Sequence, residues 1–276
     1  MDARILDVVT RGQPMRHEIW SEIRKQSPLI HNITNTVVAN FSANGLLAIG
    51  ASPVMADAIE EVAEMTFVSD VLVLNIGTLG TMTEATMIRA GQAANEAGCP
   101  IVLDPVGVGA TSFRRDVVER ILRHVRVTVI RGNAGEIATL IGVDWVARGV
   151  DAGDGACEPR QLALEAAKRY GWVIAVTGKE DVVSDGNVVM EVRGGTKRMT
   201  ETTGTGCLLS AVVGACLTVE KSALKATVTA VSGYAYCGEL ASERAEGPGD
   251  FPIHFLNALH QLTQHTIPTN RIEVST

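Results

Sequence analysis

The stretch TETTGTGCLLSA, residues 200 to 211, decides the fold. Its glycines, Gly204 and Gly206, relax the backbone directly before an apolar run that is typical of a buried helix. The amides that follow are then free at the start of that helix, where oriented N–H groups and the helix dipole bind anions. We therefore predict an anion hole formed by Gly204, Thr205, Gly206 and Cys207.

Two common nucleotide-binding motifs do not fit this stretch. It lacks the GxxxxGK[ST] pattern of a P-loop. It also lacks the third glycine and the preceding strand of a dinucleotide-binding fingerprint, and the sites GVGAT and GNAGE fail the same test. A plainer alternative stays open, in which TTGTG is only a flexible lead into a buried helix.

Cys207 lies on the first turn of the predicted helix, where a phosphate site more readily carries a carboxylate or a lysine. A helix N-terminus lowers the pKa of a thiol, so we expect an accessible thiolate there. The alternative is a small apolar filler, which is how we interpret Cys216 and Cys237, because they lie within apolar helical runs. Its position favours a functional role for Cys207.

The composition excludes several classes of protein. The 276 residues are 46% hydrophobic and carry a formal net charge of −7 without a basic block, so nucleic acid and anionic membranes are poor candidate partners. Five cysteines without CxxC spacing indicate neither a disulfide framework nor a zinc site, which favours a cytoplasmic location. The N-terminal residues have no apolar core, so we expect no signal peptide. The longest apolar run, about a dozen residues, is shorter than the ~20 that cross a bilayer.

Short apolar runs alternate with amphipathic stretches along most of the chain. This alternation predicts an α/β fold with a mostly parallel central sheet and helices on both faces, in one domain spanning residues 1–276. The Gly-rich loop at 149–159 is too short to separate domains. The expected strands are 28–33, 52–56, 71–75, 101–104, 127–130 and 173–177, with a hairpin at 182–185 and 188–193. The expected helices are 83–97, 114–123, 159–170, 207–219, 223–244 and 251–263.

Polar residues end six of these apolar runs. In open α/β sheets, ligands bind outside the carboxyl ends of the strands. A single polar strand end could simply mark the point where a strand reaches solvent. Six polar strand ends in succession favour a shared ligand cleft. The polar ends are His31–Asn32, Met55–Asp57, Asn75, Asp104, Arg131 and Thr177.

Asp104 and Glu136 are candidate ligands for Mg²⁺. Asp104 ends a predicted strand before a glycine-containing turn, where it could hold the ion directly or through water, or simply cap the turn. Glu136 stands three residues after Asn133, and the two residues also match a capping box at a helix start. Arg131, just before them, could face a nucleotide phosphate.

Together these motifs resemble a known family. A GTG turn before a long helix and an N-x-x-E element, here Asn133 to Glu136, are typical of ribokinase-like kinases, where an Asp follows the GTG as the base. This chain carries Cys207 in place of that Asp. With HNITNTVVANFSANGLLAIGASPVMADA, LDPVGVGAT, IRGNAGEI, VTGKEDVVSDG and TGTGCLLSA, the sequence resembles the 4-methyl-5-(2-hydroxyethyl)thiazole kinase family of thiamine salvage.

The resemblance implies a ribokinase-like fold without a lid, and a homotrimer with sites at subunit interfaces. It also implies transfer of the γ-phosphate of ATP, with Mg²⁺, to the primary hydroxyl of the thiazole alcohol. By motif, Asn32, Met55 and Gly204 would contact the thiazole, and Cys207 would contact the substrate hydroxyl. Arg131 and Thr177 would bind ATP. Asp104 and Glu136 would serve Mg²⁺.

Two alternatives stay open. One is a ribokinase-like kinase for another small alcohol, such as a hydroxymethylpyrimidine or a sugar, and HNITN, SPVMA and the Cys for Asp exchange argue against it. The other is a non-catalytic nucleotide-binding sensor, which the intact set of Asp104, Glu136, Arg131 and TTGTG disfavours. A dinucleotide-dependent oxidoreductase is a poor third, because the fingerprint fails.

Overall fold

The computed structural model describes residues 17–143, 158–265 and 267–275. Cys157 and most of the Gly-rich stretch at 149–159 lie outside these residues, as do parts of the domain predicted for 1–276. Among the helices of the described ranges, none combines the length and the apolar character that crossing a membrane requires.

A nine-stranded sheet, counted over the described residues, forms the centre of the molecule. Its order is β2-β1-β3-β4-β5-β6-β7-β8-β9; the pairs from β2 to β6 are parallel, and those from β6 to β9 are antiparallel. The parallel pairs bring the carboxyl ends of six strands to one edge. The strands are β1 (Leu29–Ile33), β2 (Ser52–Val54), β3 (Val71–Asn75), β4 (Ile101–Asp104), β5 (Val129–Asn133), β6 (Val173–Thr177), β7 (Asp181–Ser184), β8 (Val189–Val192) and β9 (Ile272–Ser275).

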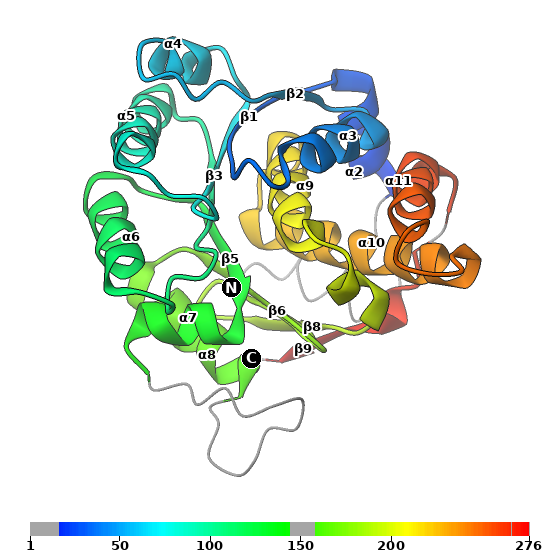
Figure 1. The fold of residues 1–276 in the computed structure, drawn as a ribbon. Coiled ribbons are helices and arrows are strands. Elements are labelled where there is room, and N and C mark those ends of the chain that lie inside the picture. Colours follow the sequence, from blue (N-terminus) through cyan, green and yellow to red (C-terminus); the bar gives the residue numbers. More distant parts are fainter. Residues whose placement is uncertain (1–16, 144–157, 266, 276) are drawn as a thin grey trace.

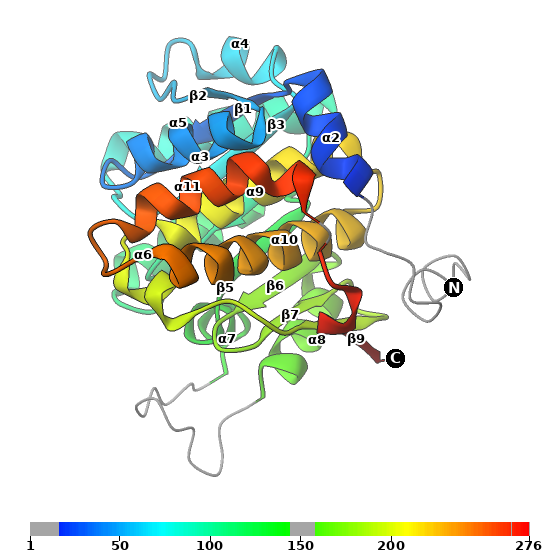
Figure 2. The ribbon, with the colours of Figure 1, turned by 90° about the vertical axis from the view of Figure 1, so that its right-hand side faces the viewer.

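Helices cover both faces of this sheet (Figures 1 and 2). The side chains of β3 alternate, so that Val71 and Val73 enter one core with α9–α11, and Leu72 and Leu74 enter the other with α5–α8. The helices are α2 (His17–Gln26), α3 (Ala39–Ile49), α4 (Val62–Phe67), α5 (Thr81–Ala97), α6 (Ser112–His124), α7 (Ala134–Ile141), α8 (Pro159–Tyr170), α9 (Thr205–Val219), α10 (Ala223–Arg244) and α11 (Phe251–Gln261). Three short 3₁₀ turns are η1 (Lys197–Glu201), η2 (Leu262–Gln264) and η3 (Thr269–Arg271).

The predicted architecture is confirmed, and five elements (β3, β4, β6, α8 and α10) have the predicted bounds. One shift matters for the site. The strand predicted at 127–130 is β5, which runs on to Asn133 because its last residues continue to pair with β6, up to Asn133 opposite Thr177. Arg131 therefore lies within the strand and does not follow it.

The C-terminal residues differ most from the prediction, which had the chain helical almost to its end. α11 ends at Gln261, and the chain returns to the sheet as β9, with Ile272 opposite Val192 of β8. A four-residue strand with alternating polar residues gives a weak sequence signal. Its pairing covers the backbone edge that β8 would otherwise expose.

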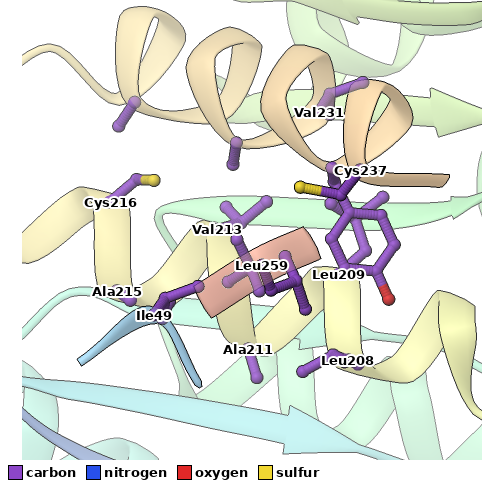
Figure 3. Close-up of a cluster of buried hydrophobic side chains, with 14 of the residues drawn as sticks. Ile49, Leu208, Leu209, Ala211, Val213, Ala215, Cys216, Val231, Cys237 and Leu259 are labelled. Carbon is purple, nitrogen blue, oxygen red and sulfur yellow. The ribbon is translucent and has the colours of Figure 1, made fainter. Parts of the chain in front are cut away.

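α9 is buried along most of its length, which explains why its sequence is apolar on all sides. Figure 3 shows Leu208, Leu209, Ala211, Val213, Ala215 and Cys216 of α9 among side chains of α3, α10 and α11. Gly214 lets the helix approach β3, since a Cβ there would lie 3.1 Å from Val73. At the other end of α9, the buried Tyr234 hydroxyl donates to the Thr205 carbonyl at 2.6 Å. The core thus fixes where the first turn of α9 lies.

Candidate functional site

Gly204 is the N-cap of α9, in the left-handed conformation with φ of 96°. A Cβ at this position would lie only 2.9 Å from Val38 Cγ1, so glycine is required by space as well as by conformation. The first helical hydrogen bond runs from Leu208 N to Gly204 O at 2.9 Å. The preceding amides, of Thr205, Gly206 and Cys207, therefore have no partner within the helix. These amides are the ones that the predicted anion hole would use, together with that of Gly204.

Asp104 ends β4 and is completely buried. Its Oδ2 accepts hydrogen bonds from Asn75 Nδ2 at 2.9 Å and from Ser210 Oγ at 2.8 Å, and lies 3.5 Å from Arg131 Nη1. Its Oδ1 is buried without a hydrogen-bond partner. Burial raises the pKa of Asp104, while the nearby Arg131 guanidinium opposes that shift. The arrangement leaves one buried carboxylate oxygen without a hydrogen-bond partner.

Arg131 places its guanidinium against the start of α9. A Cβ on Gly206 would lie 2.8 Å from Arg131 Nη2, so the helix and the cation meet without a side chain between them. The same Nη2 donates to Thr177 Oγ1 at 2.7 Å. Burial lowers the pKa of Arg131, but the carboxylates of Asp104 and Glu136 together raise it, so the group stays cationic. The structure thus brings Asp104, Arg131, Thr177 and the α9 turn into one cluster.

Glu136 forms the capping box that the sequence allowed. Its Oε2 accepts from Asn133 N at 2.8 Å, and Asn133 Oδ1 accepts from Glu136 N at 2.9 Å. Its Oε1 accepts from Gly107 N at 2.8 Å, which ties the turn after β4 to the start of α7. Burial raises the pKa of Glu136, and the two backbone donors oppose it. A surface pocket of about 550 Å³ opens beside this carboxylate and is lined by Gly107, Gly109, Ala110, Arg115, Asn133, Gly135, Glu136, Thr139, Gly142 and Val143.

Asp181 is a further titratable group near Arg131 that the sequence did not single out. It begins β7 and accepts a hydrogen bond from Gly178 N at 3.0 Å. Burial raises the pKa of Asp181 to about 6, while Gly178 and Arg131 act in the opposite direction. Its signal in the sequence was the turn TGKED, which follows the strand ending at Thr177.

Cys207 does not have the lowered pKa that its place at a helix start predicts. Burial, followed by the Asp104 carboxylate, raises the pKa of the thiol, and the amides of Asn75 and Asn35 only partly offset this. The prediction was wrong because neither burial nor Asp104 is visible from the local sequence. Near neutral pH, Cys207 is therefore a protonated thiol, which can orient a hydroxyl more readily than it can deprotonate one.

Two asparagines complete the surroundings of Cys207. Asn35 Nδ2 lies 3.5 Å from Cys207 Sγ and 2.8 Å from Asn75 Oδ1, and it donates to both. From the sequence, Asn75 is predicted only to end a strand, and Asn35 of the HNITN motif has no predicted role. The signal for both was present, because each directly follows or ends a strand at the predicted ligand edge.

In the part of the chain that the structure describes, Asn32 and Met55 do not belong to the hydrogen-bonded cluster around Cys207 and Asp104. Asn32 is buried in β1, and its amide donates to Ile30 O at 2.9 Å. Met55 is partly buried in the segment after β2. That segment is held by the buried His31, whose Nε2 is 2.8 Å from Ala56 O and whose Nδ1 is 2.9 Å from Thr66 Oγ1. Burial lowers the pKa of His31, so the ring is neutral and bridges β1 to α4.

Among the described His, Cys, Asp and Glu side chains, no group of three or more is placed to hold a metal ion. Mg²⁺ is commonly held by only one or two carboxylates, with water and substrate phosphates supplying the other ligands. The unpartnered Asp104 Oδ1 meets that requirement. Both Glu136 oxygens already accept backbone hydrogen bonds, so this carboxylate would act through its charge or through water.

Comparisons with known proteins identify the fold and the family. The fold is that of the ribokinase-like proteins: a ribokinase-like superfamily protein from Enterococcus faecalis covers 91% of this chain and 96% of its own, with a TM-score of 0.64 at 11% identity. The solved hydroxyethylthiazole kinase of Pyrococcus horikoshii is 39% identical and has a TM-score of 0.83, over 94% of this chain and 98% of its own. A curated hydroxyethylthiazole kinase from an Exiguobacterium species is 94% identical over 262 residues, which are 95% of this chain and 100% of that relative.

The fold is therefore ribokinase-like, and the relatives at 39% and 94% identity are small-molecule kinases. Residues 20–265 match the model of the hydroxyethylthiazole kinase family, and the chain belongs to that family.

Proposed function

We propose that this protein transfers the γ-phosphoryl group of ATP to the hydroxyl of 4-methyl-5-(2-hydroxyethyl)thiazole. One observation carries the proposal within this family: the start of α9, whose first amides have no partner in the helix, lies against the Arg131 guanidinium, and Arg131 Nη1 lies 3.5 Å from the buried Asp104 carboxylate. Phosphoryl transfer needs positioning and charge stabilisation more than covalent chemistry from the protein. These three features supply both.

The charged residues would handle the phosphates. The amides of Gly204 to Cys207 would hold the γ-phosphoryl group, and Arg131, held by Thr177, would offset charge on the leaving side. Asp104 and Glu136 would serve the Mg²⁺–phosphate assembly, with Asp104 Oδ1 as the oxygen available to the ion. When bound, Mg²⁺ supplies positive charge that stabilises the phosphate oxygens during transfer.

The thiazole would lie on the side of β1 and β2, against Asn32, Met55 and Gly204. His31 supports this assignment indirectly, because it holds the segment that carries Met55. Cys207 would meet the substrate hydroxyl as a neutral thiol, since its pKa is raised. We therefore assign it mainly an orienting role.

We further propose a single cytoplasmic kinase domain, acting in thiamine biosynthesis, that assembles as a homotrimer with sites at the subunit interfaces. Val37 and Leu47 support the interface, because both are strongly exposed apolar side chains, at 69% and 58%. Val37 adjoins Val38, which packs against Gly204, so a partner covering this surface would border the anion hole.

Product analysis after incubation with ATP, Mg²⁺ and the thiazole alcohol tests the proposal. We expect the phosphate ester in amounts matched by ADP, and a trimer mass by light scattering. A hydroxymethylpyrimidine and ribose are the comparison substrates. ATP consumed only with one of those would identify the other kinase class, and nucleotide binding without turnover of any alcohol would identify a sensor.

A further inference from the structure

Two buried asparagines connect Cys207 to Asp104. Asn35, in the loop after β1, is 5% exposed, and Asn75, at the end of β3, is 1% exposed. Asn35 Nδ2 donates to Cys207 Sγ at 3.5 Å and to Asn75 Oδ1 at 2.8 Å. Asn75 Nδ2 in turn donates to Asp104 Oδ2 at 2.9 Å. We call Asn35 and Asn75 the asparagine bridge.

The direction of each amide in the asparagine bridge follows from the carboxylate. Ser210 Oγ and Arg131 Nη1 also approach Asp104 Oδ2, so this oxygen is an acceptor and the Asn75 group that faces it is the NH₂ group. Asn75 Oδ1 then faces the other way, where it accepts from Gly77 N at 2.9 Å and from Asn35. Asn35 must therefore present its NH₂ group to both Asn75 and Cys207.

Packing holds the Asn35 side chain in this position. A Cβ on Gly77 would lie 2.7 Å from Asn35 Nδ2 and 2.8 Å from its Cβ, so the Gly77 backbone lies directly against the amide. The Gly77 carbonyl accepts in turn from Arg114 Nη2 at 2.8 Å. Asn35 therefore has little freedom to turn away from Cys207.

Two oxygen atoms of the asparagine bridge and its carboxylate partner, Asn75 Oδ1 and Asp104 Oδ2, are already occupied by donors. Asn75 Oδ1 already accepts from two N–H groups, and Asp104 Oδ2 accepts from Asn75 and Ser210 with Arg131 beside it. The sulfur receives an N–H from Asn35 on this side. Because Asn35 presents N–H groups to the sulfur, the S–H of Cys207 cannot use this amide as its acceptor and must point elsewhere.

We propose that Asn35 is a positioning residue, which acts through Cys207 by donating to its sulfur and so directing the thiol toward the substrate hydroxyl. Asn75 anchors Asn35 to the phosphate side of the site. The inference rests on the proposed function, because it assigns the hydroxyl of the alcohol as the thiol's partner.

A double-mutant cycle on the full-length enzyme tests the inference. Cys207→Ala should keep measurable activity, since transfer depends mainly on charge and positioning, and Cys207→Asp should remain active. Asn35→Ala should lower kcat about tenfold in the wild-type background, with little change in KM for ATP. In the Cys207→Ala background the same change should have almost no effect. An equal loss in both backgrounds, or no loss in either, would overturn the inference.

Asn35→Leu gives a second readout that needs no turnover. Leucine is close to asparagine in size and carries no charge, but it has no N–H donor, so alkylation of Cys207 by iodoacetamide at pH 8 should slow by about tenfold, as followed by peptide mass spectrometry. An unchanged or faster rate would mean that Asn35 only packs. Asn44→Ala is the matched control, because it removes an exposed Asn–Asn hydrogen bond of 3.0 Å on α3. Failure of the wild-type enzyme to make the phosphate ester would instead count against the proposed function.

Discussion

The two sides of the α9 start are built from different chemistry. The side formed by β1 to β3 presents neutral groups, from Asn35 and Asn75, beside the Cys207 thiol, and the buried Asn32 lies in β1 of the same side. The side formed by β4 to β7 carries the ionisable groups Asp104, Arg131, Glu136 and Asp181. The boundary falls between two neighbouring strands, where Asn75 pairs in register with Asp104.

This division matches what each kind of group costs to bury. Amides satisfy one another and stay neutral, so they can be buried without a counter-charge. Buried ions need partners, and here Asp104 and Arg131 compensate each other while leaving one carboxylate oxygen and the helix amides available. In the proposed reaction the alcohol would approach from the neutral side, and the charged phosphates would be held on the other.

Removing the negative charge of Asp104 should reduce the difference between the neutral and the charged side most strongly. Asp104→Asn places a neutral amide on the phosphate side and turns an acceptor into a donor toward Arg131. We expect kcat to fall about 10²–10³-fold, because a charge-stabilising group in a buried site is lost. Steady-state kinetics at saturating ATP and Mg²⁺ measure the effect.

Ser210→Ala is the control for this change, since it removes one donor to Asp104 Oδ2 at 2.8 Å and keeps the carboxylate. We expect a loss of less than tenfold for it. An Asp104→Asn enzyme that kept more than a tenth of its activity would show that the carboxylate does not serve the reaction.

Gly206→Ala tests the contact between the start of α9 and Arg131, where the two sides meet. The new Cβ would lie 2.8 Å from Arg131 Nη2 and 2.9 Å from Nη1, so the guanidinium must move away from the helix start. We expect KM for ATP to rise about tenfold, because a charge-assisted contact to phosphate is weakened. Gly214→Ala, on the same helix but against Val73, should lower the melting temperature and leave that KM unchanged. Equal KM values for the two variants would contradict a phosphate role for Arg131 at this position.

The sequence predicted the ligand edge better than it predicted the chemistry at that edge. Strand ends and turn glycines are local features, so Asp104, Arg131, Thr177 and the GTG turn could be assigned to one cleft before the fold was known. Their contacts show that these residues lie together, since Arg131 reaches Thr177, Asp104 and Gly206.

Properties that depend on tertiary surroundings could not be predicted in this way. The raised pKa of Cys207 comes from burial and from Asp104, which is more than one hundred residues away in the chain. Asn35 and Asn75 meet only because β1 and β3 are neighbours in the sheet. The strand β9 likewise depends on an edge of the sheet that only the folded chain presents.

Asp181→Asn should give the smallest effect. We expect it to change the stability of the protein, and only within a defined range of pH. The pKa of Asp181 is raised by burial from its ordinary 3.8 to about 6, so the folded state binds its proton more tightly than the unfolded state does. Its contribution to stability is therefore fully present below pH 4 and is lost as the pH rises to 6. Asparagine keeps the acceptor for Gly178 N and removes the charge. We expect the variant to gain about 1–2 kcal/mol in urea unfolding at pH 7.5 and nothing at pH 4, with activity changed less than about twofold. A gain of equal size at both pH values would show that Asp181 is not held as an unfavourable buried charge, and the charged side would then consist of Asp104, Arg131 and Glu136 alone.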